Sequence, residues 1–295
     1  MNTKITDIVL DFDGTCTVIP QVYEDYLQQF LEELNSKVFP QQSVKPEEWN
    51  KAQDTVRANS PAAGWTLLGP IPSAPAAADP YILAFEASKL ILKQRNSTIT
   101  VPPAEIHQDC YAKHQAPWRP EAREVFNKLL SKGIRLHFIT NSDKTAVTNR
   151  VLDLMNVTDL GSHNISVNGS AAKFIIGELQ WYPPAVPSIP DHVKLKFEEL
   201  RASVTSFNIG RPVYLRRPSF FNIIYQVFNE LNTLGGVVFC GDVWELDLAM
   251  PAHLGAKIHL VKRAWPFNTY PYEEEATNAA KGKISDDLKG LLEWV

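Results

Sequence analysis

The chain has 295 residues, of which 44% are hydrophobic and 21% charged, so it is long enough to bury a large core. Its formal net charge is −4, which provides no basic field for non-specific binding of nucleic acid or of acidic membranes. The three cysteines are far apart and odd in number, which fits a reducing cytosol better than a disulfide framework. With no signal-peptide core and no long apolar stretch, we expect a soluble cytoplasmic protein.

The first expected element is a buried strand at residues 8–10, which is followed at once by the acids Asp11 and Asp13 and then by Gly14 and Thr15. Two carboxylates one residue apart repel each other, and each is better solvated in water than at the end of a buried strand. A bound divalent cation would compensate them, because magnesium takes hard oxygen ligands, often one or two carboxylates together with phosphate oxygens. The alternative is a strand that ends in a polar turn, where Asp and Gly are common.

The next hundred residues are predicted to be helical. Apolar residues recur at helical spacing in four stretches, and prolines or acids mark several of their starts. These stretches are residues 22–34, 45–56, 79–91 and 103–111. We therefore expect a helical unit at residues 21–117, inserted between the two parts of an α/β domain at residues 1–20 and 118–295.

Beyond residue 118 the pattern alternates between strand and helix, which is typical of a Rossmann-like parallel sheet with crossover helices. Strands are predicted at residues 134–140, 164–167, 237–240 and 257–261, and amphipathic helices at 120–132, 142–156 and 218–234. Residues 170–212 interrupt the alternation with a candidate strand at 174–176 and a charged helix at 191–203. We interpret this interruption as a small second insertion.

Further polar groups lie at the ends of later predicted strands. Thr140 ends the second strand, and Asp242 follows the strand at 237–240, with Asp247 five residues further on. Because open α/β sheets bind ligands at the carboxyl ends of their strands, we expect these side chains to converge with Asp11 on one crevice. Each has an ordinary alternative, since Thr140 could begin a helix and Asp242 could lie in a turn. Their joint occurrence favours a site.

This set of motifs, in this order, resembles the haloacid dehalogenase (HAD) superfamily of phosphatases and phosphotransferases. The resembling segments are Asp11–Thr15, Phe138–Ser142 and Gly241–Asp247, and the stretch Arg217–Ser219 occupies the place of the third family motif. The resemblance covers residues 1–20 and about 118–265 and neither insertion. It implies a HAD-like α/β core, with the helical insertion in the place of a cap that closes over the site and selects substrates.

Carried over to these residues, the resemblance implies a phosphatase that acts on a small phosphorylated molecule through an aspartyl-phosphate. It makes Asp11 the nucleophile and Asp13 the general acid and base. The side chains of Asp11 and Asp242 and the backbone carbonyl of Asp13 are the implied Mg²⁺ ligands, with Asp247 as a further ligand, either directly or through water. The acid at Asp13 favours phosphoryl transfer, because members that act on carbon–halogen bonds usually lack it.

The resemblance also implies substrate-binding residues. Thr140 would donate its hydroxyl to a phosphoryl oxygen, with Asn141 beside it as a further contact. The third motif normally supplies a lysine before a proline, but here two arginines precede the proline. Arg217 is the preferred catalytic and phosphate-binding residue because an arginine stays charged and binds phosphate well. Arg216 and Lys173 are the alternatives, although the guanidinium differs from an ammonium in reach and geometry.

Several functional alternatives stay open at this point. The chain could be a phosphotransferase, another HAD-type hydrolase, or a non-catalytic protein that keeps the metal site and binds a partner. Candidate substrate contacts in and near the helical insertion are Arg57, Trp65, Trp118 and Arg119, although such tryptophans are more often core residues. The histidines show no metal-ligand spacing and receive no role. The sequence specifies neither the substrate nor the oligomeric state.

Overall fold

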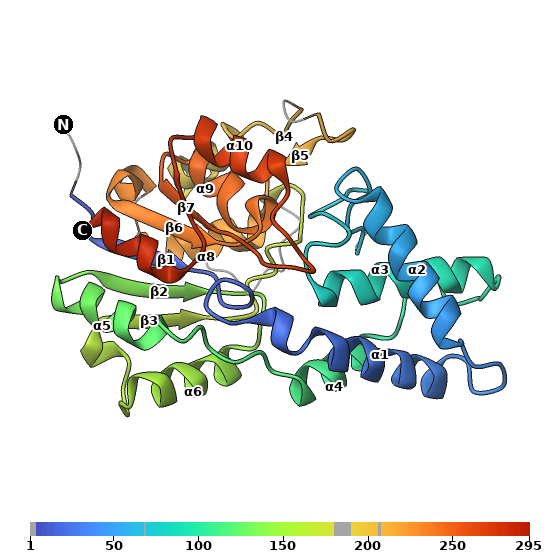
Figure 1. The fold of residues 1–295 in the computed structure, drawn as a ribbon. Helices are drawn as coiled ribbons and strands as arrows, with labels where there is room; N and C mark the ends of the chain where they lie inside the picture. Colours follow the sequence, from blue (N-terminus) through green and yellow to red (C-terminus); the bar gives the residue numbers. More distant parts are fainter. Residues whose placement is uncertain (1–3, 68, 180–189, 206–207, 230) are drawn as a thin grey trace. The chain divides into compact units, whose positions relative to one another are not determined.

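The structure is a computed structural model that describes residues 4–67, 69–179, 190–205, 208–229 and 231–295. The described residues form two compact units (Figure 1). The core unit consists of Met1–Thr17, Trp118–Arg263 and Thr269–Val295. The helical unit consists of Val18–Pro117 and Ala264–Asn268. The short segment Ala264–Asn268, expected within the α/β domain, thus belongs to the helical unit.

The core unit is built on a parallel sheet of six strands in the order β3-β2-β1-β6-β7-β8. The strands are β1 Asp7–Leu10, β2 Arg135–Ile139, β3 Ile165–Asn168, β6 Val237–Gly241, β7 Lys257–Val261 and β8 Lys283–Ser285. The predicted Rossmann-like parallel sheet is confirmed, and β8 is an additional edge strand that the sequence did not predict. The strand order reverses at β1, which lies between β2 and β6, and such a reversal creates the crevice in which α/β proteins bind ligands.

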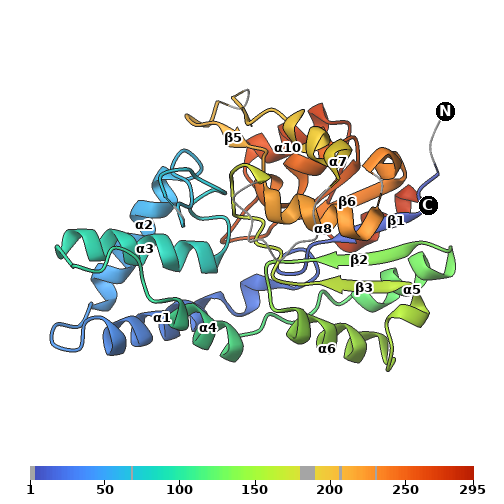
Figure 2. The ribbon, with the colours of Figure 1, turned by 180° about the vertical axis from the view of Figure 1, so that it is seen from behind.

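Helices cover both faces of this sheet (Figures 1 and 2). One face packs against α5 Ala122–Ser131, α6 Lys144–Met155 and the 3₁₀ helix η6 Leu288–Trp294. The other packs against α7 Asp191–Glu198, α8 Pro218–Phe228, α9 Ala249–His253 and α10 Pro271–Ala279. Strand β1 packs on both faces of the sheet. Ile8 and Leu10 point toward the face covered by α5, α6 and η6, and Val9 points toward the opposite face. This burial on two sides explains why the strands read as continuous apolar runs.

The predicted crossover helices of the core unit are present, with small differences in their ends. Helix α8 stops at Phe228, earlier than expected, because Asn229 adopts a left-handed conformation (φ 54°) that ends the helix. Short 3₁₀ helices complete the unit at η2 Gly161–His163 and η4 Leu231–Gly236.

The second insertion is part of the core unit. It contains α7 and the strand β4 Ser203–Val204, which pairs antiparallel with β5 Val213–Tyr214 directly after the insertion. Val193 and Phe197 of α7 are buried in the same hydrophobic cluster as α8. The strand predicted at residues 174–176 is wrong, since these residues form a turn and irregular backbone. Residues 180–189 and 206–207 of the insertion lie outside the described residues.

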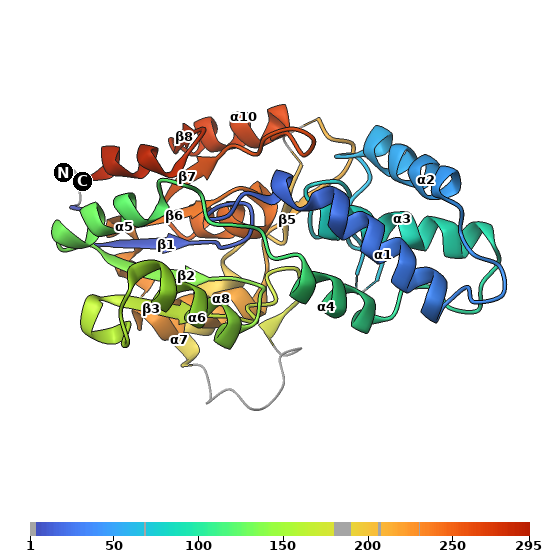
Figure 3. The ribbon, with the colours of Figure 1, turned by 60° about the horizontal axis from the view of Figure 1, so that its bottom comes forward.

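The helical unit contains the four helices that the sequence predicted. They are α1 Tyr23–Lys37, α2 Pro46–Asn59, α3 Pro80–Gln94 and α4 Ala104–Lys113, preceded by a 3₁₀ turn η1 Ile19–Gln21. Helix α1 lies beside α4, and α2 packs against α3 (Figure 3). Asp79 caps α3 by accepting a hydrogen bond from the Ile82 N–H at 2.7 Å. Within the described part of the chain, no helix is long and apolar enough to cross a membrane.

Candidate active site

Asp11 lies directly after β1, at the carboxyl end of the sheet. Its backbone N–H donates to the carbonyl of Cys240 at 2.9 Å, which ties it to β6. Its carboxylate accepts hydrogen bonds from the Lys173 ammonium at 2.7 Å and from the Thr15 hydroxyl at 3.1 Å. The Asp11 side chain is nonetheless 12% exposed. Asp11 is therefore fixed in orientation and still reachable from solvent, as a nucleophile must be.

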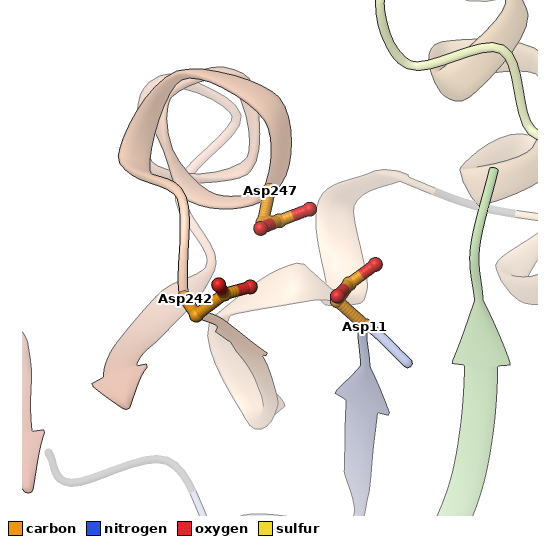
Figure 4. A group of neighbouring side chains, drawn as sticks. All are labelled: Asp11, Asp242 and Asp247. Carbon is orange, nitrogen blue, oxygen red and sulfur yellow. The ribbon is translucent and has the colours of Figure 1, made fainter. Parts of the chain in front are cut away.

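Asp242 and Asp247 come from the end of β6 and approach Asp11 (Figure 4). Asp247 lies in the π-helical turn η5 Trp244–Leu248, and its carboxylate also accepts the Val243 N–H at 3.1 Å. Two glycines make this approach possible. A Cβ on Gly14, where φ is +82°, would lie 2.3 Å from Oδ2 of Asp242. A Cβ on Gly241 would lie 2.2 Å from the Cβ of Asp247. Both positions therefore require glycine.

The three carboxylates form a set of oxygen donors suited to a divalent cation. One oxygen each from Asp11, Asp242 and Asp247 lies within 4.8 Å of the others. Three carboxylates against the one Lys173 ammonium leave these four side chains with a net negative charge. Carboxylate oxygens are also the ligands that magnesium prefers. The donor set therefore fits the Mg²⁺ that the resemblance implies.

Lys173 supplies the positive charge that contacts Asp11. Its Nζ lies 2.7 Å from Oδ1 of Asp11 and 2.8 Å from Oδ1 of Asp247, and its side chain is 2% exposed. The preference for Arg217 in this role is therefore revised in favour of Lys173. The Arg217 guanidinium is fully buried, and its Nη1 donates to the backbone carbonyl of Lys173. Arg216 instead pairs with Glu178 at 2.7 Å.

The backbone after β3 brings Lys173 to the end of β1. Ser170 and Ala172 both adopt left-handed backbone conformations, with φ of 52° and 45°. The Ala171 N–H between them donates to the carbonyl of Thr140 at 2.9 Å, which holds the segment against the end of β2. Left-handed backbone at a serine and an alanine is uncommon and costs energy. These two bends direct the Lys173 side chain across the sheet end toward Asp11.

Thr140 and Asn141 lie at the end of β2 as expected, and the structure records local hydrogen bonds for both. Thr140 is 1% exposed, and its hydroxyl oxygen accepts the Ser142 N–H at 3.1 Å. The Asn141 side-chain oxygen accepts the backbone N–H of Lys173 at 2.7 Å. Both side chains thus hold together the segments that carry the site. Their contact with a phosphoryl group stays a prediction.

Asp13 lies two residues after Asp11 and is partly buried. Its Oδ2 accepts a short hydrogen bond from the hydroxyl of Ser142, which follows β2. The loop that carries Asp13 is fixed by Arg119, whose guanidinium donates to the carbonyls of Thr15 at 2.8 Å and Gly14 at 3.0 Å. Both acids of the first motif therefore have defined partners within the core unit.

Burial and neighbouring charges set the electrostatics of the site. Burial raises the pKa of Asp11 to about 7, with Lys173 opposing this rise and the nearby acids Asp247 and Asp13 adding to it. Burial by itself disfavours the charge on Lys173, but Asp11 and Asp247 more than offset it, so that the pKa of Lys173 is raised. Lys173 is therefore a permanent cation that lies among a cluster of acids.

A second layer of buried ion pairs supports the loop that carries the acids after β6. Arg263 donates to the carbonyl of Asp242 and pairs with Glu273, from Nη1 to Oε1 at 3.1 Å. Glu273 in turn accepts the Trp244 N–H at 3.0 Å. Within the same loop, Glu245 is paired with Arg211 at 2.6 Å. These contacts stabilise the turn in which Asp242 and Asp247 lie.

Sequence reasoning missed three of these supporting residues, Thr15, Ser142 and Arg263, and it named Lys173 only as an alternative to Arg217. Thr15 and Ser142 stand inside the quoted motifs, so their hydroxyls beside the acids were a usable signal. Arg263 gave no such signal, because it is far from the acids in sequence and reaches Asp242 only through the fold.

Three of the four other candidate contacts named from the sequence, Trp118, Arg119 and Arg57, have side-chain partners in the structure. Trp118 packs edge-on against Phe12, with ring centroids 5.1 Å apart, and so belongs to the core. Arg119 binds the loop of the first motif, as described above. In the helical unit, Arg57 donates to the carbonyl of Pro266 at 3.1 Å and lies over the ring of Phe267. These contacts explain the positions of the three side chains, and none of them requires a bound substrate.

Comparison with protein families identifies the class of the protein. The model of the haloacid dehalogenase-like hydrolases matches residues 7–180, which is more than half of the chain. The chain therefore belongs to the haloacid dehalogenase-like hydrolase family. The matched region includes Asp11, Asp13, Thr140 and Lys173. No curated protein sequence matches the chain.

Solved structures share the fold over nearly the whole chain. One is described as a predicted phosphoglycolate phosphatase from Haemophilus somnus, with a TM-score of 0.50, 13% identity, and coverage of 99% of this chain and 98% of that one. Another is described as a HAD-hydrolase from Bacillus subtilis bound to magnesium, with a TM-score of 0.51, 10% identity and 98% coverage of both chains. A third is a HAD-like hydrolase from Streptococcus pneumoniae, with a TM-score of 0.50, 12% identity and 98% coverage of both chains. At these identities the likeness is one of fold.

Proposed function

We propose that this hydrolase is a Mg²⁺-dependent phosphatase that cleaves a small phosphorylated substrate through an aspartyl-phosphate at Asp11. One observation carries the proposal: Asp11 is held by Lys173 yet partly exposed, and a second acid, Asp13, is held two residues away by Ser142. A phosphoryl transfer through a carboxylate needs this pair, one group to attack and one to exchange protons. Membership of the family and the fold shared with a magnesium-bound HAD-hydrolase support it.

In the first step, an oxygen of Asp11 attacks the phosphorus atom and the bond from phosphorus to the leaving oxygen breaks. The carboxylic acid form of Asp13 gives its proton to that oxygen, which departs as an alcohol. The Lys173 ammonium lies 2.7 Å from Asp11, where it would orient the carboxylate and offset the negative charge of an incoming phosphate. Asp11 then carries the phosphoryl group as a mixed anhydride.

In the second step, a water molecule attacks the phosphorus atom of the aspartyl-phosphate. The carboxylate of Asp13 removes a proton from this water, and the bond from phosphorus to Asp11 breaks. Inorganic phosphate leaves, Asp11 regains its carboxylate, and Asp13 regains its proton. Splitting the reaction in this way replaces one very slow hydrolysis by two easier displacements.

Asp11, Asp242 and Asp247 are the side chains that would hold the cation, together with the backbone carbonyl of Asp13. When bound, Mg²⁺ would neutralise these acids and stabilise charge on the phosphoryl oxygens. Nearly complete burial of Asp242 and Asp247 would strengthen this interaction, because water does not screen it.

The proposal is tested by assaying the purified protein against a broad panel of phosphate esters with Mg²⁺ and with EDTA. We expect phosphate release that depends on Mg²⁺. Asp11→Asn should abolish turnover, and Asp153→Asn, an exposed position on α6, should leave it unchanged. Release of phosphate by the Asp11→Asn variant at the normal rate would overturn the nucleophile assignment. Product analysis with added alcohols would distinguish hydrolysis from transfer to an organic acceptor.

A further inference from the structure

Ser142 is a polar residue of the core that contacts the proposed acid and base but takes no part in the bond changes described above. Its hydroxyl donates to Oδ2 of Asp13. A carboxylate that must give a proton in one step and take one in the next depends on its orientation. A misplacement of about 1 Å at such a group can cost about 100-fold in rate. A fixed donor on one of its oxygens restricts that orientation.

The backbone of Ser142 is anchored on two neighbouring strands. Its N–H donates to the hydroxyl oxygen of Thr140 at 3.1 Å, and its carbonyl accepts the Ser170 N–H at 2.8 Å. Gly169 permits this close packing, because a Cβ there would lie 2.7 Å from the Ser142 carbonyl oxygen. Ser142 is therefore attached to the ends of both β2 and β3, and its hydroxyl has little freedom to move.

The Asp13 side of the contact is fixed as well. The Gly14 N–H that follows Asp13 donates to the Thr17 hydroxyl oxygen at 3.1 Å, and Arg119 binds the Gly14 carbonyl at 3.0 Å. The hydrogen bond thus joins two rigid segments of the core unit, the loop after β1 and the turn after β2. Both partners of this hydrogen bond are therefore held in place by the structured backbone of the core unit.

We propose that Ser142 is a positioning residue that orients the carboxyl group of Asp13 for proton transfer to the leaving group. This inference rests on the proposed phosphatase function. The hydroxyl donates to Oδ2 and so fixes the plane of the carboxyl group relative to Asp11. Ser142 takes part in no bond that forms or breaks. Its contribution is made through Asp13 alone.

The dependence of rate on the leaving group separates this role from a purely structural one. Help from a general acid matters most when the leaving oxygen is strongly basic, as in phenyl phosphate, and least when it is weakly basic, as in 2,4-dinitrophenyl phosphate. Loss of the Asp13 orientation should therefore slow the first substrate much more than the second. A general loosening of the site should slow both alike.

The experiment measures kcat/KM with Mg²⁺ for both esters in the wild type and in Ser142→Ala, Ser142→Thr and Ser142→Cys. We expect Ser142→Ala to lose about tenfold or more on phenyl phosphate and less than about twofold on the dinitrophenyl ester. Ser142→Thr keeps the hydroxyl and should approach the wild type. Ser142→Cys has a weak donor and should resemble Ser142→Ala, so it serves as the test if the alanine variant does not fold.

Each outcome has a defined meaning. Equal losses on the two esters, or no loss on either, in a folded Ser142 variant would overturn the positioning role and leave the phosphatase proposal standing. A wild-type protein that hydrolyses neither these esters nor any member of the broad panel would overturn the phosphatase proposal, and the positioning role with it. Thermal unfolding of each variant verifies that the compared proteins are folded.

Discussion

Two acids lie at opposite ends of the same strand, the buried Asp7 at the start of β1 and the partly exposed Asp11 just after its end. Asp7 is 2% exposed, and its carboxylate receives hydrogen bonds from Arg135 at 2.7 and 2.8 Å, from His137 at 2.8 Å and from Thr6 at 2.7 Å. Asp11 has one ammonium partner, Lys173, and shares it with another acid. Positive and donor groups dominate around Asp7, whereas acids dominate around Asp11.

The two environments shift the two carboxyl groups in opposite directions. At Asp7, burial would raise the pKa, but the hydrogen bonds from His137 and Arg135 outweigh it and hold the pKa below its usual range. At Asp11, burial and the neighbouring acids prevail, and the pKa rises to about 7. An acid whose charge is fully compensated serves stability, and one whose charge is left in excess is available to a cation or a substrate. The comparison separates an acid that serves structure from the acid that we propose to be the nucleophile.

The largest expected effect comes from removing the basic partner of the functional acid. Lys173→Met should lower kcat/KM for phosphate esters by about 10³-fold, because it removes the cation that contacts Asp11 and that, under the proposed function, would face the incoming phosphate. It also leaves Asp11 and Asp247 without their shared ammonium, so the melting temperature should depend more strongly on Mg²⁺ than in the wild type. Steady-state kinetics and thermal unfolding with and without Mg²⁺ measure both effects.

Lys128→Met is the matched control, because Lys128 is exposed on α5 and pairs with Glu124 on the surface. It should keep normal kinetics. Normal rates in Lys173→Met would contradict the assignment of Lys173 and return the role to another basic residue, with Arg217 the first to consider.

Lys173 also shows which parts of the site could be predicted from the sequence and which could not. Five of the six strands of the parallel sheet, the helices α1 to α8 and the acids at the strand ends follow from apolar periodicity and from motif order, and the structure confirms them. The sequence did not predict β8, α9 or α10. The sequence favoured Arg217 because an arginine before a proline occupies the place of the family lysine. Lys173 reaches Asp11 only because Ser170 and Ala172 take left-handed conformations, which residue preferences disfavour. A bend that opposes local propensity is visible only in the fold.

The acid Asp7 shows the same limit in another form. From sequence it is one polar residue before an apolar run, in the place where strands commonly begin. Its burial depends on Arg135 and His137, which lie on β2 more than 120 residues away in the chain. The groups that compensate the buried charge of Asp7 lie on the neighbouring strand. The periodicity of residues along β1 alone therefore cannot predict them.

A second, intermediate effect is expected from Asp7→Asn. The amide cannot accept from Arg135 and His137 as the carboxylate does, so we expect a loss of about 2 kcal/mol in the free energy of unfolding. The kcat/KM should not change, because Asp7 lies at the other end of β1 from the site. Urea unfolding at pH 7 and phosphate-ester kinetics give the two readings. A loss of activity without a loss of stability would contradict the structural role of Asp7.

The same variant sharpens the comparison as a function of pH. The folded-state pKa of Asp7 lies below its unfolded value, so its contribution is fully present above the unfolded pKa of about 4 and is lost as the pH falls toward the folded value. The stability difference between the wild type and Asp7→Asn should therefore be constant from pH 7 to about pH 5 and shrink below about pH 4.

The smallest effect is expected from Arg135→Met, which removes the basic partner of the structural acid. The Arg135 side chain is 56% exposed, and Asp7 keeps its hydrogen bonds from His137 and Thr6 when the guanidinium is gone. We therefore expect a loss of at most about 1 kcal/mol in unfolding free energy and no change in kcat/KM. High salt should reduce the difference, because water and ions reach an exposed guanidinium.

Urea unfolding at low and at about 1 M salt measures this difference in stability. Arg135→Lys is the control that keeps the charge and loses the bidentate contact. A large loss that does not respond to salt would mean that Asp7 depends on Arg135 as closely as Asp11 depends on Lys173. The two acids would then not differ in how much each relies on a single basic partner, which would contradict the comparison.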